Sequence, residues 1–326
     1  MNNYRTDLIN HISQLRGSNV ISYIGGDRQN MSIRIAPDII PVFYKHLEKM
    51  GKSSKIDLFL FTKGGDVLTA LRLVELLYEY TDDFSVLIPY KSYSAGTLIS
   101  LGASEIVMTK LAELSPIDPN VTSTFNPLDS NNPNVRLPIS VEDVYSFFNI
   151  ATDEMGLKTD DSLVKVFSLL SEHVHPLAIG SVYRSHAMIR SIANKLLLKH
   201  INPSEKYKIN EIIENLTENL HSHSYMISRQ EAKNLIKLPI TYCDNDLEKY
   251  MWNLYKTYEN DLLLDRPFAP EQILTPNGKF SVCCGIIESN YYTDGYIFEG
   301  NIPKIPNVKN SLDSINITEQ GWRQLR

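Results

Sequence analysis

The sequence predicts an α/β fold with a parallel sheet whose strands are joined by helical crossovers. Apolar runs of strand length alternate with runs of helical apolar spacing from residue 20 to residue 108. Two of these strands, Ile56–Phe61 and Phe84–Pro89, run into small-residue turns that lead directly into helices. Parallel strands need crossover connections, so this alternation favours βαβ units.

Each expected element has a local reason. Leu8, Ile9, Ile12 and Leu15 have helical spacing, and Gly17 ends that helix before the first apolar strand. The expected order along this part of the chain is helix 4–15, strand 20–24, helix 37–50, strand 56–61, helix 67–80, strand 84–89, helix 96–102 and strand 105–108.

After Met108 the alternation stops. The segment 122–138 is polar and proline-rich, which indicates a surface loop. Helical spacing then predicts helices at 140–150, 161–173, 177–200, 210–220 and 229–235. We therefore expect a domain over residues 1–240 that carries a helical insertion at about 122–175.

Beyond about Lys237 the chain changes character. Pro267, Pro270 and Pro276 precede two tyrosine-rich strand candidates at 282–287 and 291–298, and a polar stretch follows Pro306. These features predict a β-rich C-terminal extension over residues 241–326 with a polar tail.

Composition excludes several classes of protein. The chain of 326 residues has 32 Lys and Arg against 38 Asp and Glu, a net charge of −6, and no basic run, so nucleic acid is not expected as a partner. No stretch approaches the ~18 uninterrupted apolar residues of a membrane span. The odd count of 3 cysteines fits a reducing compartment, and we expect a cytoplasmic protein.

No cofactor is expected. The cysteine and histidine spacings match no metal-ligand framework, and the sequence has no glycine-rich phosphate loop.

The turn Tyr93-Ser94-Ala95-Gly96-Thr97 is the strongest pointer to chemistry. It places the Ser94 hydroxyl at the end of a strand with the backbone N–H of Ala95 beside it, as a serine nucleophile requires. The Gly64-Gly65 pair permits close backbone approach, so its N–H groups could face a developing oxyanion together with Ala95. The alternative is an ordinary pair of βα turns. Ser92 stands where an α/β-hydrolase elbow has glycine, which disfavours that family.

The groups that would activate Ser94 are less clear from spacing alone. Of the 8 histidines, those within predicted helices fit surface or core roles, whereas His221 and His223 lie in a loop. Asp118 lies between two prolines, which would hold an orienting carboxylate in direction. It fits a turn or capping aspartate equally well.

Several motifs resemble the serine dehydrogenase proteinase family, within the Clp-protease/crotonase superfamily that also includes signal-peptide-peptidase-like enzymes. The resemblance covers about the first three quarters of the chain and is carried by Val20–Ile24, Thr62–Val67, Tyr93–Met108, Leu114–Pro119 and Ser222–Ala232.

This resemblance implies a Clp/crotonase-like fold and an ATP-independent serine peptidase that acts on peptides or proteins. It implies Ser94 as nucleophile, Asp118 as orienting carboxylate and His223 as general base, with the oxyanion held near Gly64, Gly65 and Ala95. It also implies self-association into homo-oligomers. The chain departs from the family pattern at Ser224 and Ser115, where members often have aspartate and glycine.

Three alternatives stay open. A Ser–Lys dyad needs a desolvated lysine, for which Lys63, Lys158, Lys165 and Lys195 are the candidates. A crotonase-type acyl-CoA enzyme would use the paired N–H groups on a thioester enolate and would not need Ser94. A catalytically silent scaffold of the same fold would use neither.

Overall fold

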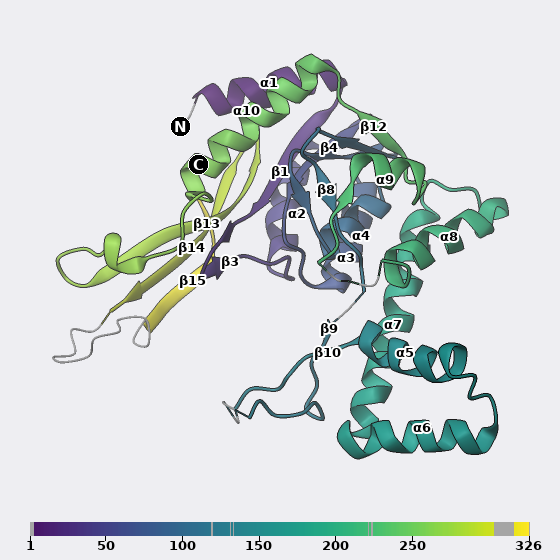
Figure 1. The fold of residues 1–326 in the computed structure, drawn as a ribbon. Coiled ribbons are helices and arrows are strands. Elements are labelled where there is room, and N and C mark those ends of the chain that lie inside the picture. Colours follow the sequence, from purple (N-terminus) through teal and green to yellow (C-terminus); the bar gives the residue numbers. More distant parts are fainter. Residues whose placement is uncertain are drawn as a thin grey trace. The chain divides into compact units, whose positions relative to one another are not determined.

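The computed structural model describes residues 3–118, 120–130, 132, 134–220, 222, 224–302 and 316–325 (Figure 1). The chain divides into two compact units, the first formed by Met1–Leu114 with Met226–Arg326 and the second by Ser115–Tyr225. This division does not coincide with the boundary expected near residue 240. The segment expected as a C-terminal extension lies within the first unit.

The first unit is built on one mixed sheet, which has eight strands among the described residues. Its strand order is β12-β7-β5-β4-β1-β13-β14-β15. The parallel part confirms the α/β fold expected from the sequence, and it comprises β1 (Asn19–Gly25), β4 (Ile56–Phe61), β5 (Phe84–Ile88), β7 (Glu105–Met108) and β12 (Ile240–Tyr242). The antiparallel part comprises β13 (Lys279–Ser289), β14 (Thr293–Asn301) and β15 (Asn316–Gln324).

Helices cover both faces of this sheet (Figure 1). Alternate residues of β4 face opposite ways, and Phe59 and Phe61 pack under two helices, α1 (Asn3–Arg16) and α10 (Asn245–Leu262). On the other face Tyr23 of β1 contacts Phe43, with ring centroids 6.2 Å apart. That face carries α2 (Ile39–Met50), α3 (Val67–Tyr78) and α4 (Ala95–Leu101).

Helix α10 was not predicted from the sequence. The Asp244 carboxylate caps it by accepting the Leu247 N–H at 2.8 Å, and its apolar residues Leu247, Met251, Leu254 and Tyr258 are all buried against α1 and the sheet. Both the cap and the helical spacing are visible in the sequence. The sequence prediction assigned no element to this segment, whereas its two strand candidates, 282–287 and 291–298, correspond to β13 and β14.

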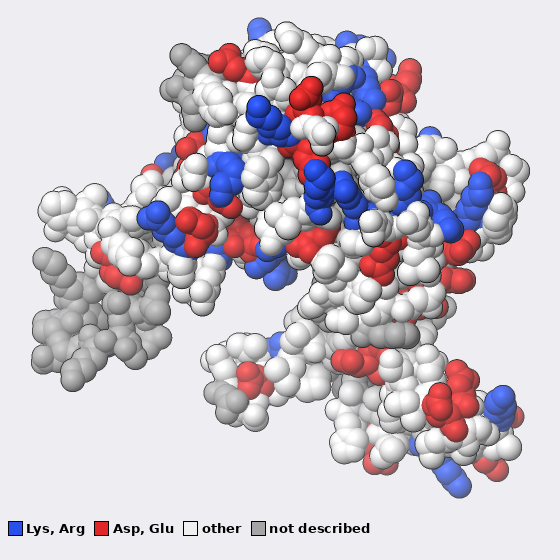
Figure 2. Space-filling model, turned by 45° about the horizontal axis from the view of Figure 1, so that its top comes forward, with Lys and Arg blue, Asp and Glu red and all other residues white. Residues whose placement is uncertain are grey.

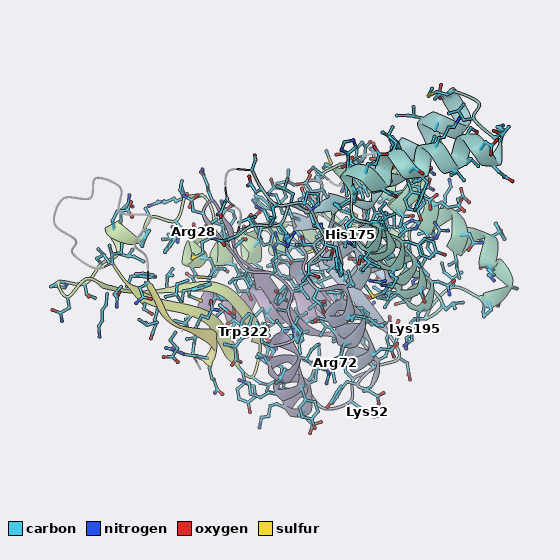
Figure 3. The ribbon with its side chains drawn as sticks, turned by 90° about the horizontal axis from the view of Figure 1, so that it is seen from below. Arg28, Lys52, Arg72, His175, Lys195 and Trp322 are labelled. Carbon is cyan, nitrogen blue, oxygen red and sulfur yellow. The ribbon has the colours of Figure 1, made fainter. Side chains whose placement is uncertain are left out.

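The β13–β14 hairpin is fastened to α2 by buried polar groups. His46 Nδ1 lies 2.8 Å from Ser289 Oγ, and His46 Nε2 lies 3.0 Å from an Asp294 carboxylate oxygen. Trp322 of β15 packs across the same sheet, with its ring centroid 6.4 Å from that of Tyr23 (Figure 3). All three members of the Ser289–His46–Asp294 set are buried, so no substrate reaches them and their role is structural.

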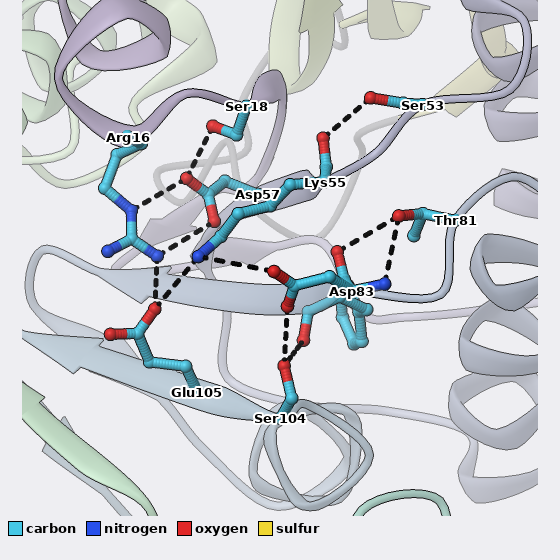
Figure 4. Close-up of polar contacts among 10 residues, drawn as sticks. Arg16, Ser18, Ser53, Lys55, Asp57, Thr81, Asp83, Ser104 and Glu105 are labelled. Atoms are coloured by element: carbon cyan, nitrogen blue, oxygen red, sulfur yellow. Dashed lines mark hydrogen bonds and ion pairs between the residues drawn. The ribbon is translucent and has the colours of Figure 1, made fainter.

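Charged side chains tie the amino ends of the parallel strands together (Figure 4). Arg16, at the end of α1, donates from Nε to the buried Asp57 carboxylate at 3.0 Å and from Nη2 to Glu105 at 2.5 Å. Lys55 Nζ lies 3.3 Å from the same Glu105 carboxylate. This network lies at the edge of the sheet opposite the two turns that follow β4 and β5.

Short elements complete the first unit. A three-stranded sheet joins β6 (Lys91–Ser92), β8 (Glu113–Leu114) and β11 (Ile227–Ser228), which leads into α9 (Arg229–Asn234). A hairpin of β2 (Asp27–Arg28) and β3 (Met31–Ser32) follows β1, and the single turn η3 (Pro270–Gln272) precedes β13.

The second unit is mainly helical, as the sequence predicts for most of this segment. Val121, Val141, Val144 and Val182 form its small core. Its elements are β9 (Asn120–Val121), β10 (Ile139–Ser140), α5 (Val141–Asn149), the π-helix η1 (Ile150–Glu154), α6 (Asp160–His173), α7 (Pro176–Leu197), η2 (Pro203–Glu205) and α8 (Lys206–Thr217).

Within the described part of the chain, none of the helices combines the length and the apolar character that crossing a bilayer requires. On the face shown in Figure 2, Lys and Arg side chains are interspersed with Asp and Glu side chains.

Candidate active site

The two turns predicted from the sequence lie side by side at the carboxyl edge of the sheet. The Thr62 N–H donates to the Lys91 carbonyl at 2.9 Å, and the Tyr93 N–H donates to the Thr62 carbonyl at 3.0 Å. These bonds extend the parallel pairing of β4 and β5 beyond the strands. The Gly64-Gly65 turn is thereby held against the turn that carries Ser94.

Gly64 allows the closest approach of the two turns. Its φ is +94°, and a Cβ built on it would lie 2.7 Å from Ser94 Cβ and 3.1 Å from the Ala95 nitrogen. Any side chain here would displace Ser94. The glycine is required by contact as well as by its backbone angle.

Gly65 is fixed from the other side by the segment after β3. Its φ is +153°, and a Cβ would lie 2.2 Å from the Ile35 carbonyl oxygen. The Ile35 N–H donates to the Gly64 carbonyl at 2.9 Å, and the Asp66 N–H donates to the Ile35 carbonyl at 2.8 Å. Asp66 then caps α3 by accepting the Thr69 N–H at 2.7 Å. The loop is therefore hydrogen-bonded on both sides, to Ile35 and to the first turn of α3.

Ser94 has a strained backbone. Its φ of 52° and ψ of −111° lie in a region that residues other than glycine rarely adopt, at a cost of about 1–3 kcal/mol. It precedes α4, whose first turn closes through the Gly96 N–H donating to the Tyr93 carbonyl at 2.8 Å. Strain of this kind is typical of a serine displayed on a sharp strand-to-helix turn.

The N–H groups around Ser94 divide into two sets. The Gly64 N–H donates to Thr62 Oγ1 at 3.0 Å and is therefore occupied. The N–H groups of Gly65 and Ala95 make no hydrogen bond to any residue that the structure describes. Two such donors beside a serine hydroxyl are what stabilisation of an oxyanion needs.

Thr62 is a positioning residue that the sequence analysis did not identify. It is fully buried, and its hydroxyl and backbone together hold the Gly64 turn. A threonine at a strand end, two residues before a glycine, can bond its own turn in this way. That pattern was present in the sequence but is common in ordinary turns.

Charged side chains lie next to the two turns. Lys63 and Lys91 both form ion pairs with Asp27, the latter at 3.2 Å. The Lys63 side chain is 48% exposed, so it is not desolvated. Burial raises the pKa of Tyr93, and a hydrogen bond to the Glu113 carboxylate raises it further.

The remaining predicted residues lie elsewhere in the chain. Asp118 is buried at the start of the second unit, next to Ile117, whose N–H donates to the Leu216 carbonyl of α8 at 3.0 Å. His223 lies outside the described residues. The structure thus brings Ser94, Gly64, Gly65 and Ala95 together, while the meeting of Ser94 with Asp118 and His223 stays a prediction.

Residues 1–130 match the model of a family described as ClpP-like SDH-type serine proteinase. The predicted family resemblance is confirmed over this segment. The matched segment contains both turns and Asp118, and it ends before His223.

Two uncharacterised proteins of Methanocaldococcus jannaschii are similar in sequence. One is 28% identical over 184 residues, which cover 56% of this chain and 53% of the relative. The other is 33% identical over 90 residues, or 28% of this chain and 26% of the relative. The match thus spans about half of the first relative and a quarter of the second.

Among solved structures, a mutant of the 1510-N membrane-bound stomatin-specific protease, in complex with a substrate peptide, aligns with a TM-score of 0.38 at 13% identity. The alignment covers 70% of this chain and 78% of that one.

Proposed function

We propose that the chain is an ATP-independent intracellular serine peptidase that hydrolyses peptide bonds with Ser94 as nucleophile. The observation that carries this proposal is the strained backbone of Ser94 beside the N–H groups of Gly65 and Ala95, which make no hydrogen bond to any described residue. The match of residues 1–130 to a serine proteinase family supports it.

The proposed mechanism follows the logic of a serine triad. Ser94 Oγ attacks the peptide carbonyl while His223 accepts its proton, and Asp118 stabilises the imidazolium that forms. The Gly65 and Ala95 N–H groups donate to the oxyanion of the tetrahedral intermediate. His223 then protonates the leaving amine, and water releases the acyl group by the reverse steps.

The lysines beside Ser94 in the first unit do not suit a Ser–Lys dyad. A catalytic lysine must be neutral to accept a proton, which requires desolvation. Lys63 and Lys91, the lysines next to the two turns, instead form ion pairs with the Asp27 carboxylate, and the Lys63 side chain is 48% exposed. Neither is suited to act as a base.

A crotonase-type acyl-CoA enzyme is the second candidate function. The same Gly65 and Ala95 donors would suit a thioester enolate, but that chemistry gives no reason for the backbone strain at Ser94. A silent scaffold likewise leaves the strain unexplained. Backbone strain persists only where the surrounding contacts enforce it, and strained residues are concentrated at functional sites.

Labelling with a fluorophosphonate probe tests the proposal. We expect rapid labelling of the wild type, none of Ser94→Ala, and a loss of at least about 100-fold in His223→Ala, since general-base assistance is typically worth 10²–10⁴-fold. His221→Ala is the matched control and should label normally. Equal labelling of His223→Ala and wild type would refute the triad, and no labelling of the wild type would refute the peptidase.

Peptides or proteins are the proposed substrates, and we propose a homo-oligomer as the working form. Sedimentation velocity of the full chain across a range of concentrations tests the second point. A single species of about 37 kDa, the mass of one chain, would contradict it.

A further inference from the structure

A cavity of about 390 Å³ opens at the carboxyl edge of the sheet in the first unit. One wall is the loop after β7, residues 109–111, and the other is the first two turns of α10, with Asn245, Glu248, Lys249 and Trp252. None of these residues takes part in the proposed chemistry.

The cavity wall is bonded to the segment that leads to Ser94. The Thr109 hydroxyl donates to the Pro89 carbonyl at 2.7 Å, and the Glu113 N–H donates to the Tyr90 carbonyl at 2.7 Å. Ser94 follows Pro89 by five residues, a span of at most about 18 Å. An extended peptide of about five residues is as long as this stretch of chain.

Both walls of the cavity carry an apolar side chain. Trp252 and Leu111 offer apolar surface, and the Leu111 side chain is 50% exposed. The Trp252 ring lies 5.2 Å from that of Tyr255, which packs in the core and keeps the indole in place. A bulky apolar side chain fits this surface.

The charged residues that line the cavity are two lysines, Lys110 and Lys249, and one glutamate, Glu248. Glu248 is compensated, because it accepts the Lys110 N–H at 2.9 Å and its other oxygen lies 3.4 Å from Lys110 Nζ. Lys249 adds a further ammonium group to the lining. The cavity therefore favours an apolar side chain that has a carboxylate next to it.

We infer that this cavity is a remote substrate subsite. It binds an aromatic or branched apolar residue of an extended peptide, followed by an acidic residue whose carboxylate faces Lys249. This inference rests on the proposed peptidase function and names the substrate class that it acts on. Binding at such a distance from the scissile bond orients the substrate.

Trp252 itself reports on occupancy. The chain has 2 tryptophans, so a Ser94→Ala, Trp322→Phe double variant fluoresces from Trp252 alone and does not turn peptides over. The ligands are blocked ten-residue Ser/Ala peptides with Phe-Glu, Phe-Lys or Ala-Glu at the centre. We expect Phe-Glu to change the emission and to bind at least about tenfold more tightly than the other two.

Charge reversal tests the role of Lys249. Lys249→Glu should reverse the order of Phe-Glu and Phe-Lys, whereas Lys256→Glu, further along α10 and outside the cavity lining, should preserve it. Unchanged Trp252 emission with Phe-Glu, or an unchanged order in Lys249→Glu, would overturn the inference.

Fluorophosphonate labelling of the single variant Trp322→Phe separates the two proposals. Labelling without peptide-dependent emission would overturn the subsite and leave the peptidase standing. Peptide-dependent emission without labelling would show that the cavity binds peptides but would overturn the peptidase, and with it the role of the cavity as a substrate subsite.

Discussion

Single residues decide whether Ser94 is presented for reaction. Gly64 and Gly65 make close contacts that leave no room for a Cβ, and the Thr62 hydroxyl accepts the Gly64 N–H. The sequence identified the glycines because a glycine pair after a strand is a recognisable pattern. Thr62 escaped notice because its role depends on a hydrogen bond to its own turn.

Gly64→Ala should abolish labelling of Ser94 by the fluorophosphonate. The new Cβ would lie 2.7 Å from Ser94 Cβ, so the serine turn must move. Gly17→Ala is a matched control, because Gly17 also has positive φ, +60°, but has nothing within 4 Å of a Cβ. Both variants should lose about 1 kcal/mol of stability from the backbone angle, with a larger loss for Gly64→Ala. Wild-type labelling of Gly64→Ala would show that the turns are not in close contact.

At the scale of elements, the strands are secured at both ends by different means. The carboxyl ends are joined by backbone bonds between turns, and the amino ends by the ion pairs of Arg16 with Asp57 and Glu105 (Figure 4). Burial opposes ionisation of Glu105, but hydrogen bonds from Arg16 and Thr241, with the charges of Arg16 and Lys55, lower its pKa to about 2.

Glu105→Gln should therefore change how stability depends on pH. The pKa of Glu105 is lower in the folded state than its ordinary value of 4.5, so its ionisation stabilises the fold above pH 4.5, and this contribution disappears as the pH falls through 2. The variant should be less stable by up to about 3 kcal/mol at pH 6 and nearly equal to wild type near pH 2.

Urea unfolding of both proteins at each pH measures this difference. Glu113→Gln, at a carboxylate away from the network, serves as the comparison. A stability gap for Glu105→Gln that does not shrink on acidification would contradict the assignment of the network.

At the scale of the whole molecule, the chain leaves the first unit at Leu114 and returns at Met226. Leu114 pairs with Ile227 across β8 and β11, so the points where the chain leaves and re-enters the first unit are adjacent.

Replacing residues 115–225 by a glycine-rich turn of about four residues should give a folded first unit. The replacement lacks Asp118 and His223, so it should fail to label with the fluorophosphonate. Near-UV circular dichroism checks that the shortened protein folds. Rapid labelling of the shortened protein would exclude Asp118 and His223 from the mechanism.

A chain ending at residue 240 should not fold. It loses β13, the antiparallel neighbour of β1, and α10, which covers Leu8, Ile9 and Ile12. Binding of a hydrophobic dye and loss of near-UV dichroism would show the exposed core. A cooperative thermal transition of this truncated chain would instead support the domain boundary expected from the sequence.

The sequence by itself determined the α/β class, the order of the longer strands and helices before Met108, and the two turns, because periodic burial and small turn residues are local properties. It did not predict the two-residue strands β2, β3 and β6. Tertiary structure alone decided that β13, β14 and β15 extend the main sheet and that α10 covers it beside α1. It also decided that Gly64 meets Ser94, thirty residues apart along the chain. These outcomes depend on pairing between distant segments, and no local pattern of residues specifies which edge of a sheet a later strand will join.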